Sequence, residues 1–317
     1  MTTTADGRLD PPAERDSYYG QPVLKEPVWT VEIPIYMFVG GLAGASATLA
    51  ALCGRRHSRL ARRSWLTALA GLAVSPALLI SDLGRPERFL NMLRMFKVTS
   101  PMSVGSWVLA LSGASTSGAA LHELTGRFQL VGRLSRPLAG LLGLPLATYT
   151  GALIAQTSVP VWHEARRELP ALFGAGAAAS AGAAAVALSP VEEAGPARRL
   201  AVIGATAELA LVAAMERRLG ELGEPYHEGQ AAPYGQAARV LTAAGAVVTA
   251  GAARRSRAAA VAGSAMLLAG AVCERFSVFK AGFGSARDPK YTVAPQRRRV
   301  GAGEGHGASR KAAATAP

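Results

Sequence analysis

Long apolar runs alternate with short polar segments along most of the chain. Eight runs can be marked, over residues 33–53, 64–81, 105–124, 138–158, 169–189, 200–215, 240–253 and 258–279. Most are close to the roughly twenty residues that an α-helix needs to cross the hydrocarbon core of a bilayer. Because backbone polar groups in hydrocarbon must hydrogen-bond internally, each run predicts a helix. The pattern predicts an all-α integral membrane protein with eight transmembrane helices arranged as two four-helix bundles.

The eight runs differ in composition. The first four and the eighth are rich in Leu, Ile, Val, Phe or Met, which predicts clear transmembrane helices. The fifth, ELPALFGAGAAASAGAAAVALS, and the seventh consist mostly of Ala and Gly, and we expect their hydropathy to be weaker. Such small residues suit close helix packing inside a bundle, and the alternative is an Ala-rich core helix of a soluble domain.

The two ends of the chain differ from its apolar middle. Residues 1–30 form a polar tail that lacks the basic segment and apolar core of a cleaved signal peptide. Residues 281–317 form a basic, low-complexity tail. Between them, residues 31–280 are predicted to be one transmembrane domain, with a first bundle at about 33–158 and a second at about 169–280.

Charged residues are concentrated in the loops. The chain is 50% hydrophobic and only 17% charged, with a formal net charge of +13. The loops after the first, third, fifth and seventh runs carry arginines at 55, 56, 59, 62 and 63, at 127, 133 and 136, at 198 and 199, and at 254, 255 and 257. The positive-inside rule makes these loops cytoplasmic and both termini exoplasmic, although Arg297, Arg298 and Arg299 favour the opposite orientation. Topology thus accounts for the basic charge, and no nucleic-acid partner is predicted.

Few residues of the chain are suited to hold a redox cofactor. Cys53 and Cys273 are too few for an iron–sulfur cluster, which needs about four thiolates. None of the five histidines lies at the centre of an apolar run, where the axial ligands of a membrane haem belong. We therefore predict no intrinsic haem, iron–sulfur cluster or metal site, so that electrons for any redox chemistry must come from a partner.

Ionisable side chains inside the apolar runs are candidates for function, because they are costly at membrane depth. Glu208 lies in the middle of the sixth run, and it is either a protonated residue bonded to a neighbouring helix or a proton-relay site. Glu274 and Arg275 lie near the end of the last run. As sequence neighbours they should point in different directions, so each is expected to find its own partner or the interface. Glu208 and Glu274 are the candidate proton-transfer residues.

Two tyrosines in the apolar runs are candidates for binding an amphiphilic ring. Tyr36 lies in the first run and Tyr149 in the fourth. Tyrosine offers an aromatic body with a hydroxyl donor, which suits a quinone. In the alternative interpretation, each hydroxyl merely bonds a backbone group inside the bundle.

The loop SDLGRPERFLNMLRMFKVTSPMSVGSW, residues 81–107, is unusually charged for a connection between apolar runs. Pro86 can open a short helix, on which Arg85 and Arg88 come close together. Ser100 and Pro101 suit the start of the third helix, and Trp107 suits the membrane interface. The loop is a solvated basic linker, a docking surface for another protein, or a lid over a small pocket.

Several stretches resemble one known family. DLGRPERF followed by TSPMSVGSW, together with IYMFVGGLAGASA and TYTGALIAQTSVPVW, is similar to the NrfD/PsrC family, the integral membrane subunits of polysulfide-reductase-like molybdoenzyme complexes. These matches cover roughly residues 28–165, whereas residues 170–260 match only in hydropathy. The segment FKAGFGSARDPKYTVAPQRRR resembles shorter bacterial members found beside formate-dehydrogenase-like enzymes.

This resemblance implies a multi-pass protein of the bacterial cytoplasmic membrane that anchors a respiratory oxidoreductase. Its partners would be an iron–sulfur, ferredoxin-like subunit and a molybdopterin-type catalytic subunit, with a formate-dehydrogenase-like enzyme as one candidate. The exchangeable substrate would be menaquinone or ubiquinone, and the chain itself would be a non-catalytic or quinone-reactive subunit. The alternatives are a proton- or ion-translocating membrane protein and a passive anchor without quinone chemistry.

The resemblance also implies site residues. The family tyrosine that contacts the quinone head falls on Tyr149, while Tyr36 and Ile33 occupy first-helix positions where a family member has a histidine and an asparagine. Tyr36 can still donate a hydrogen bond, but Ile33 cannot. Asp82 or the pair His163 and Glu164 would exchange protons, and the 81–107 loop would dock the iron–sulfur subunit. The docking candidates on this loop are Arg85, Arg88, Ser100, Pro101 and Trp107.

Overall fold

The computed structural model describes residues 24–54, 58–83, 85–293 and 295 of the 317-residue chain. Most of the predicted tail at 1–30 and of the tail at 281–317 therefore lies outside the described residues. The chain divides into two compact units, Pro27–Ser285 and a smaller unit formed by the two chain ends. Within the smaller unit, Arg287 donates to both carboxylate oxygens of Glu26, with Nε–Oε1 at 2.8 Å and Nη2–Oε2 at 3.1 Å. These hydrogen bonds hold the pKa of the partly exposed Glu26 carboxyl below its usual value.

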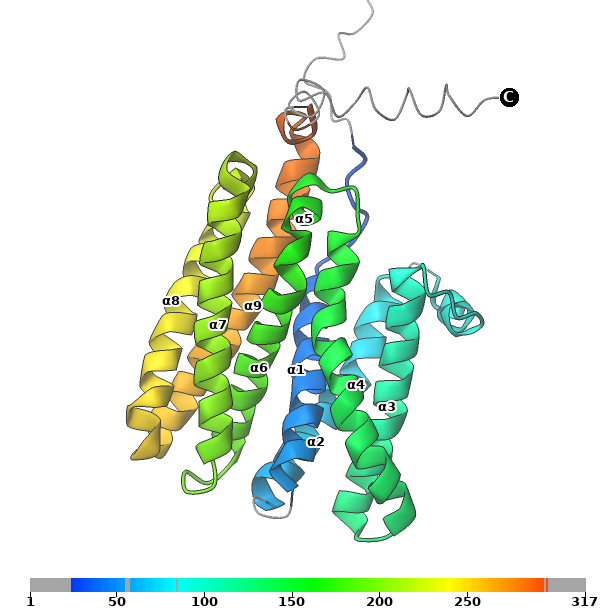
Figure 1. The fold of residues 1–317 in the computed structure, drawn as a ribbon, viewed down its shortest axis with the longest axis vertical. Coiled ribbons are helices and arrows are strands. Elements are labelled where there is room, and N and C mark those ends of the chain that lie inside the picture. The colour runs from blue at the N-terminus through cyan, green and yellow to red at the C-terminus, as the bar shows by residue number, and fades with distance from the viewer. Residues whose placement is uncertain (1–23, 55–57, 84, 294, 296–317) are drawn as a thin grey trace, which may run out of the picture. The chain divides into compact units, whose positions relative to one another are not determined.

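Long helices make up most of the unit Pro27–Ser285, where they lie side by side (Figure 1). They are α1 (Glu32–Cys53), α2 (Ser58–Ser81), α3 (Pro101–Thr125), α4 (Gln129–Ala155), α6 (Leu169–Leu188), α7 (Gly195–Leu219), α8 (Ala231–Ala250) and α9 (Arg257–Arg287). The shorter helices are α5 (Pro160–Glu164) and the 3-10 turns η2 (Pro86–Leu93), η3 (Ala165–Arg167), η4 (Gly220–Tyr226) and η5 (Ala252–Arg254). No β-strand occurs in the described residues, and each of the eight predicted apolar runs overlaps a different long helix, with ends that differ by up to nine residues.

Five of the described helices are long and apolar enough to cross a membrane, namely α1, α2, α4, α6 and α9. The prediction of an all-α membrane protein is therefore confirmed, whereas the count of eight spans and the two four-helix bundles stay predictions. The expectation of weak hydropathy for α6 was wrong, because its alanines make its most apolar stretch as hydropathic as that of α1.

Helix α3 was expected among the clear spans, but it is not one of these five. Its serines and threonines lower its hydropathy. Two of these hydroxyls bond carbonyls of the preceding turn of the same helix, Ser106 at 2.8 Å from Met102 O and Ser115 at 2.7 Å from Leu111 O. Such bonds reduce the cost of placing α3 in an apolar environment.

Helix α1 packs against α2, α4 and α6, and α4 also packs against α3 and α6. The backbones of α1 and α4 touch where two glycines face each other. A Cβ atom added to Gly44 would lie 2.6 Å from the carbonyl oxygen of Gly143. One turn further, the Thr48 hydroxyl donates to Gly140 O at 2.8 Å. Small residues thus set the distance between these two helices.

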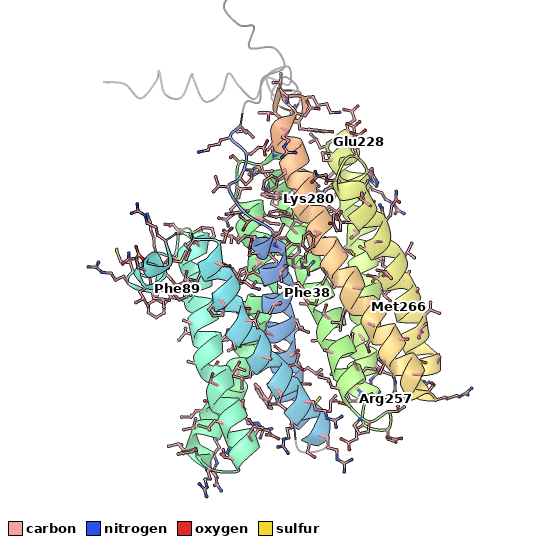
Figure 2. All side chains as sticks on the ribbon, turned by 180° about the vertical axis from the view of Figure 1, so that it is seen from behind. Phe38, Phe89, Glu228, Arg257, Met266 and Lys280 are labelled. Carbon is pink, nitrogen blue, oxygen red and sulfur yellow. The ribbon has the colours of Figure 1, made fainter. Side chains whose placement is uncertain are left out.

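Helices α6 to α9 pack in a similar way. Helix α7 packs against α6 and α8, and a Cβ atom added to Gly245 of α8 would lie 2.9 Å from Leu267 Cγ of α9. Near the junction of α5 with α9, the buried Trp162 donates its indole N–H to Val278 O at 2.7 Å. Figure 2 shows Glu228 and Arg257 at opposite ends of these helices.

We predict that Gly44→Val lowers the stability of the protein by about 1–3 kcal/mol, because the added side chain forces α1 away from α4. The measurement is thermal unfolding in detergent. The matched control is Gly113→Val, since a Cβ atom at Gly113 of α3 meets nothing within 4 Å. Equal unfolding temperatures for the two variants would show that α1 and α4 are not in backbone contact.

Candidate functional site

A cavity of about 230 Å³ lies where the first four helices meet the segment before α1. Its apolar lining comes from α1, α2, η2, α3 and α4 and from Val28 and Trp29, and its polar lining residues are Tyr36, Asp82, Ser106, Tyr149 and Thr150. Tyr36, Tyr149 and Asp82, which the sequence predicts as site residues, are thus brought together. Ile33 also lines the cavity.

The hydroxyls of Tyr36 and Tyr149 are in direct hydrogen-bond contact, and either can be the donor. Tyr36 is only 2% exposed, so bulk water does not compete for the hydrogen bond between the two hydroxyls. The Tyr149 ring lies against Gly105 of α3, where any Cβ atom would overlap it. Sequence reasoning missed Gly105, and the only available signal was a glycine in the first turns of a predicted apolar helix.

Asp82 follows the last residue of α2 and holds the chain before α1. Its Oδ1 atom accepts from the Thr30 backbone N–H at 3.0 Å and from the Thr30 hydroxyl at 2.5 Å. The segment that carries Trp29 is thereby tied to the end of α2, beside the tyrosines. Asp82 therefore fixes the segment before α1 through Thr30 and also places a carboxylate at the cavity.

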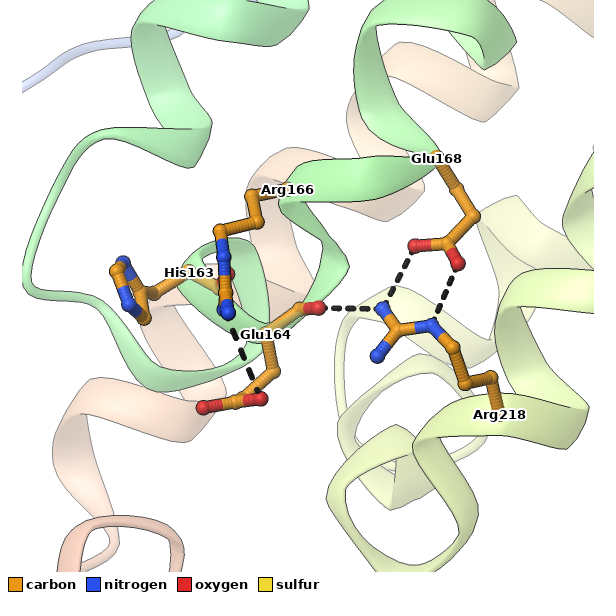
Figure 3. Close-up of polar contacts among 5 residues, drawn as sticks. All are labelled: His163, Glu164, Arg166, Glu168 and Arg218. Carbon is orange, nitrogen blue, oxygen red and sulfur yellow. Dashed lines mark hydrogen bonds and ion pairs between the residues drawn. The ribbon is translucent and has the colours of Figure 1, made fainter.

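His163 and Glu164 lie on α5, and they do not line this cavity. Their neighbourhood is a polar cluster that joins the α5 segment to α7 (Figure 3). Arg218 donates to both carboxylate oxygens of Glu168, at 2.5 and 2.6 Å, and also to Glu164 O. Arg166 lies 3.1 Å from His163 O and 3.9 Å from the Glu164 carboxylate. These contacts fix the connection between α4 and α6.

The 81–107 loop contains the predicted short helix, which begins at Pro86. Ser100 caps α3, since its side chain accepts from Ser103 N at 3.4 Å, and Pro101 is the first residue of that helix. The Trp107 indole N–H donates to Met95 O at 3.4 Å. Arg85 is exposed, while the side chain of Arg88 lies outside the described part of the chain. The loop also exposes apolar side chains that the sequence interpretation overlooked, Leu90, Met95, Phe96 and Val98.

A second polar cluster lies between α6, α7 and α9. Glu208, Glu274 and Arg275 are all at most 4% exposed. Arg275 pairs with the carboxylate of Glu274, donates to Phe173 O at 3.0 Å, and lies 3.9 Å above the Phe173 ring. The expectation that Glu274 and Arg275 find separate partners was wrong. Their side chains are long enough to meet, and pairing reduces the cost of burying both charges.

Two further features belong to this second cluster. A Cβ atom added to Gly176 of α6 would lie 2.5 Å from Glu208 Oε1, so a glycine makes room for the carboxyl. A small cavity of about 30 Å³ reaches from Glu208 and Glu274 to Tyr226, Glu216 and Arg239. This volume is enough for about two water molecules.

Within the described residues, no group of three or more His, Cys, Asp or Glu is placed to hold a metal ion. The predictions of no haem and no iron–sulfur cluster remain predictions from the sequence.

The apolar helices define an integral membrane protein that contains a cavity lined by Tyr36 and Tyr149 and a buried cluster of Glu208, Glu274 and Arg275. The chain belongs to the NrfD polysulfide reductase family, because the family model described as polysulfide reductase matches residues 16–287. The resemblance noted in the sequence is thereby confirmed. Membership indicates a membrane subunit of an oxidoreductase complex. No curated protein matches the chain.

Proposed function

We propose that this protein is the membrane-anchoring subunit that binds quinone or quinol in a respiratory oxidoreductase complex. In this function, it exchanges electrons between the quinone pool and an iron–sulfur partner subunit. The observation that carries the proposal is the pair of tyrosine hydroxyls in a mainly apolar cavity. A quinone head is an apolar ring with two carbonyl acceptors, and it needs this combination of surfaces and donors.

The lining residues fit the quinone as an exchangeable substrate. Ile33, Met37, Leu79 and Leu153 offer apolar surface on several sides. Tyr36 and Tyr149 each have one hydroxyl hydrogen, and a bound carbonyl would take the donor that the two hydroxyls now share. The quinone supplies the redox chemistry, while the chain binds and orients its head.

Proton exchange at this site is best assigned to Asp82. Thr30 occupies only its Oδ1 atom, so Oδ2 is the acceptor facing the site in our proposal. His163 and Glu164, the alternative exchange groups, lie outside the cavity lining. Their backbone carbonyls accept from Arg166 and Arg218, and the Glu164 carboxylate lies 3.9 Å from Arg166.

The partner would dock over the 81–107 loop. Met92 of η2 and Asp82 line the cavity, so a protein bound to this loop lies next to the quinone. The exposed Arg85 and the exposed apolar residues of the loop offer a mixed surface, as protein interfaces do. We propose an iron–sulfur subunit there and a molybdopterin-type enzyme beyond it. The eight helices would span a bacterial cytoplasmic membrane as two four-helix bundles with both termini exoplasmic.

Tyr149→Phe should raise the KM for quinol or lower its turnover by about tenfold, because one hydrogen bond to the head is lost while the ring stays packed on Gly105. The measurement is quinol oxidation by the isolated complex, with co-purification of the partner subunits as the assembly check. Tyr234→Phe is the matched control, since Tyr234 of α8 stacks on Phe276 instead. Unchanged quinol kinetics in Tyr149→Phe would favour the passive anchor.

The second cluster supports proton transfer as an additional candidate function. Arg275 can balance only one carboxylate, and it pairs with Glu274. Neither oxygen of Glu208 has a hydrogen-bond partner among the described residues. An ionised Glu208 would leave a buried net charge, so we propose that Glu208 carries a proton.

The cavity beside the cluster gives this proton a route outward. It reaches Glu216, which lies 3.0 Å from Arg239 and 3.7 Å from the half-exposed His227. Two waters in this space would join Glu208 and Glu274 to that surface pair. Proton exchange with the end of the bundle that carries η4 is therefore the proposed role of both carboxyls.

Glu208→Gln should remove modification by dicyclohexylcarbodiimide, which reacts with protonated carboxyls in apolar surroundings. It should also remove the infrared carbonyl band of a buried carboxylic acid. The measurement is mass-spectrometric mapping of the labelled peptide in the intact complex, with Glu216→Gln as the control that keeps the label. A Glu208→Gln protein labelled on α7 as strongly as the wild type would contradict this assignment.

A further inference from the structure

A third hollow of about 300 Å³ lies between the start of α7 and the end of α8, in neither of the two sites above. Three of its lining residues are arginines, Arg198, Arg199 and Arg254. It belongs to the arginine-rich end of the helices, where Figure 2 shows Arg257, which follows Arg254 by three residues. The opposite end carries η4 and Glu228.

Some arginines at this end form hydrogen bonds or ion pairs with other parts of the protein. Arg257 donates to Val186 O at 3.1 Å and to Ser189 O at 2.8 Å, and so caps the carbonyls at the end of α6. Arg198 donates to Val191 O at 2.9 Å, and Arg59 lies 3.7 Å from Glu193.

Arg199 and Arg254, in contrast, make no such contacts within the described part of the chain. Among the described residues, neither side chain has a hydrogen bond or an ion pair, and the lining of the hollow includes no carboxylate. Arg254 and Arg199 are close enough to the half-buried Arg198 for their positive charges to repel it. Three like charges around one hollow repel one another, and an anion between them would relieve this repulsion.

The rest of the lining is apolar or hydroxylic. Val202 and Ile203 continue the hollow along α7, and Ile203 is 66% exposed. On the facing helix, Val247 is 73% exposed about one turn before Ala250. Thr249 also lines the hollow, and its buried hydroxyl has no partner among the described residues. Guanidinium groups and an exposed aliphatic strip therefore follow one another along the helix axis, whereas the Thr249 hydroxyl lies on the side of Gly263 in α9.

We infer that this hollow binds an anionic phospholipid, with the phosphate between Arg199, Arg254 and Arg198 and the acyl chains along Ile203 and Val247. Phosphate is the anion that arginine forks match in geometry. The aliphatic strip selects a lipid over free phosphate, because inorganic phosphate has nothing to place on it. Anionic lipids are enriched near basic pockets on the cytoplasmic side, where the arginine-rich loops are predicted to lie.

The test is thermal unfolding of the full-length protein in nanodiscs of phosphatidylcholine with increasing fractions of phosphatidylglycerol, together with native mass spectrometry of retained lipids. The wild type should gain stability with phosphatidylglycerol and keep bound lipid. Arg199→Gln and Arg254→Gln should each need about tenfold more of the anionic lipid for the same effect. Arg255→Gln, which removes the same charge from the same loop outside the hollow, should behave as the wild type.

Two further arms separate the possible ligands and exclude a folding defect. Inorganic phosphate added to pure phosphatidylcholine nanodiscs should leave the unfolding temperature unchanged, and stabilisation equal to that by phosphatidylglycerol would overturn the lipid assignment. Arg254→Lys, which keeps the charge, should retain most of the lipid response even if Arg254→Gln folds poorly. Equal lipid responses in Arg254→Gln, Arg255→Gln and the wild type would overturn the site itself.

Discussion

The close approach of α1 and α4 at Gly44 and Gly143 is the contact on which the tyrosine cavity depends. Tyr36 precedes Gly44 by eight residues, about 12 Å along α1, and Tyr149 follows Gly143 by six residues, about 9 Å along α4. Because consecutive long helices alternate in direction, both tyrosines lie on the same side of this crossing. A wider crossing would separate the two hydroxyls, so backbone contact between two glycines is a condition for the polar pair.

Glycine serves the same purpose at the buried polar groups. Gly105 leaves room for the Tyr149 ring, Gly176 for the Glu208 carboxyl and Gly282 for the Trp162 indole. In each place, the glycine lies on one helix and the functional or anchoring side chain comes from another part of the chain. A membrane bundle gains little from hydrophobic contrast with lipid, so close packing of this kind must provide much of its specificity. The small residues thus determine where large or polar side chains can be buried.

Much of this structure follows from sequence pattern, and the exceptions have physical reasons. Hydropathy locates all eight long helices, because length and apolar content decide which segments enter the membrane, but some helix ends differ from the predicted ones by up to nine residues, as at the start of α4 and of α8. Residue chemistry selects Tyr36, Tyr149 and Asp82, which the structure brings to one cavity. Residue chemistry also selects His163 and Glu164, which lie elsewhere, since a loop can turn its side chains in directions that no periodicity fixes. The contacts at Gly105, Gly176 and Gly282 could not be predicted, because they depend on how neighbouring helices are aligned along their axes, and a single sequence does not give that alignment.

The pairing of Glu274 with Arg275 shows a different limit. Helical geometry sends adjacent Cβ atoms apart, and this argument holds on a solvated surface, where each side chain can reach water. In the bundle interior, the alternative to pairing is a buried charge without a partner, which costs far more than an unfavourable rotamer.

The arginines at the other end of the helices also fall into two groups, those with a hydrogen-bond partner in the described part of the protein and those without one. The positive-inside rule counts every loop arginine equally. However, Arg257 and Arg198 donate hydrogen bonds to backbone carbonyls that follow α6. Arg199 and Arg254 are exposed and have no such partner among the described residues. A loop arginine therefore carries information beyond topology only when the hydrogen bonds around it have been assigned. In our proposal, an unpaired arginine marks an anion site only where it also lines a hollow, as Arg199 and Arg254 do and Arg255 does not.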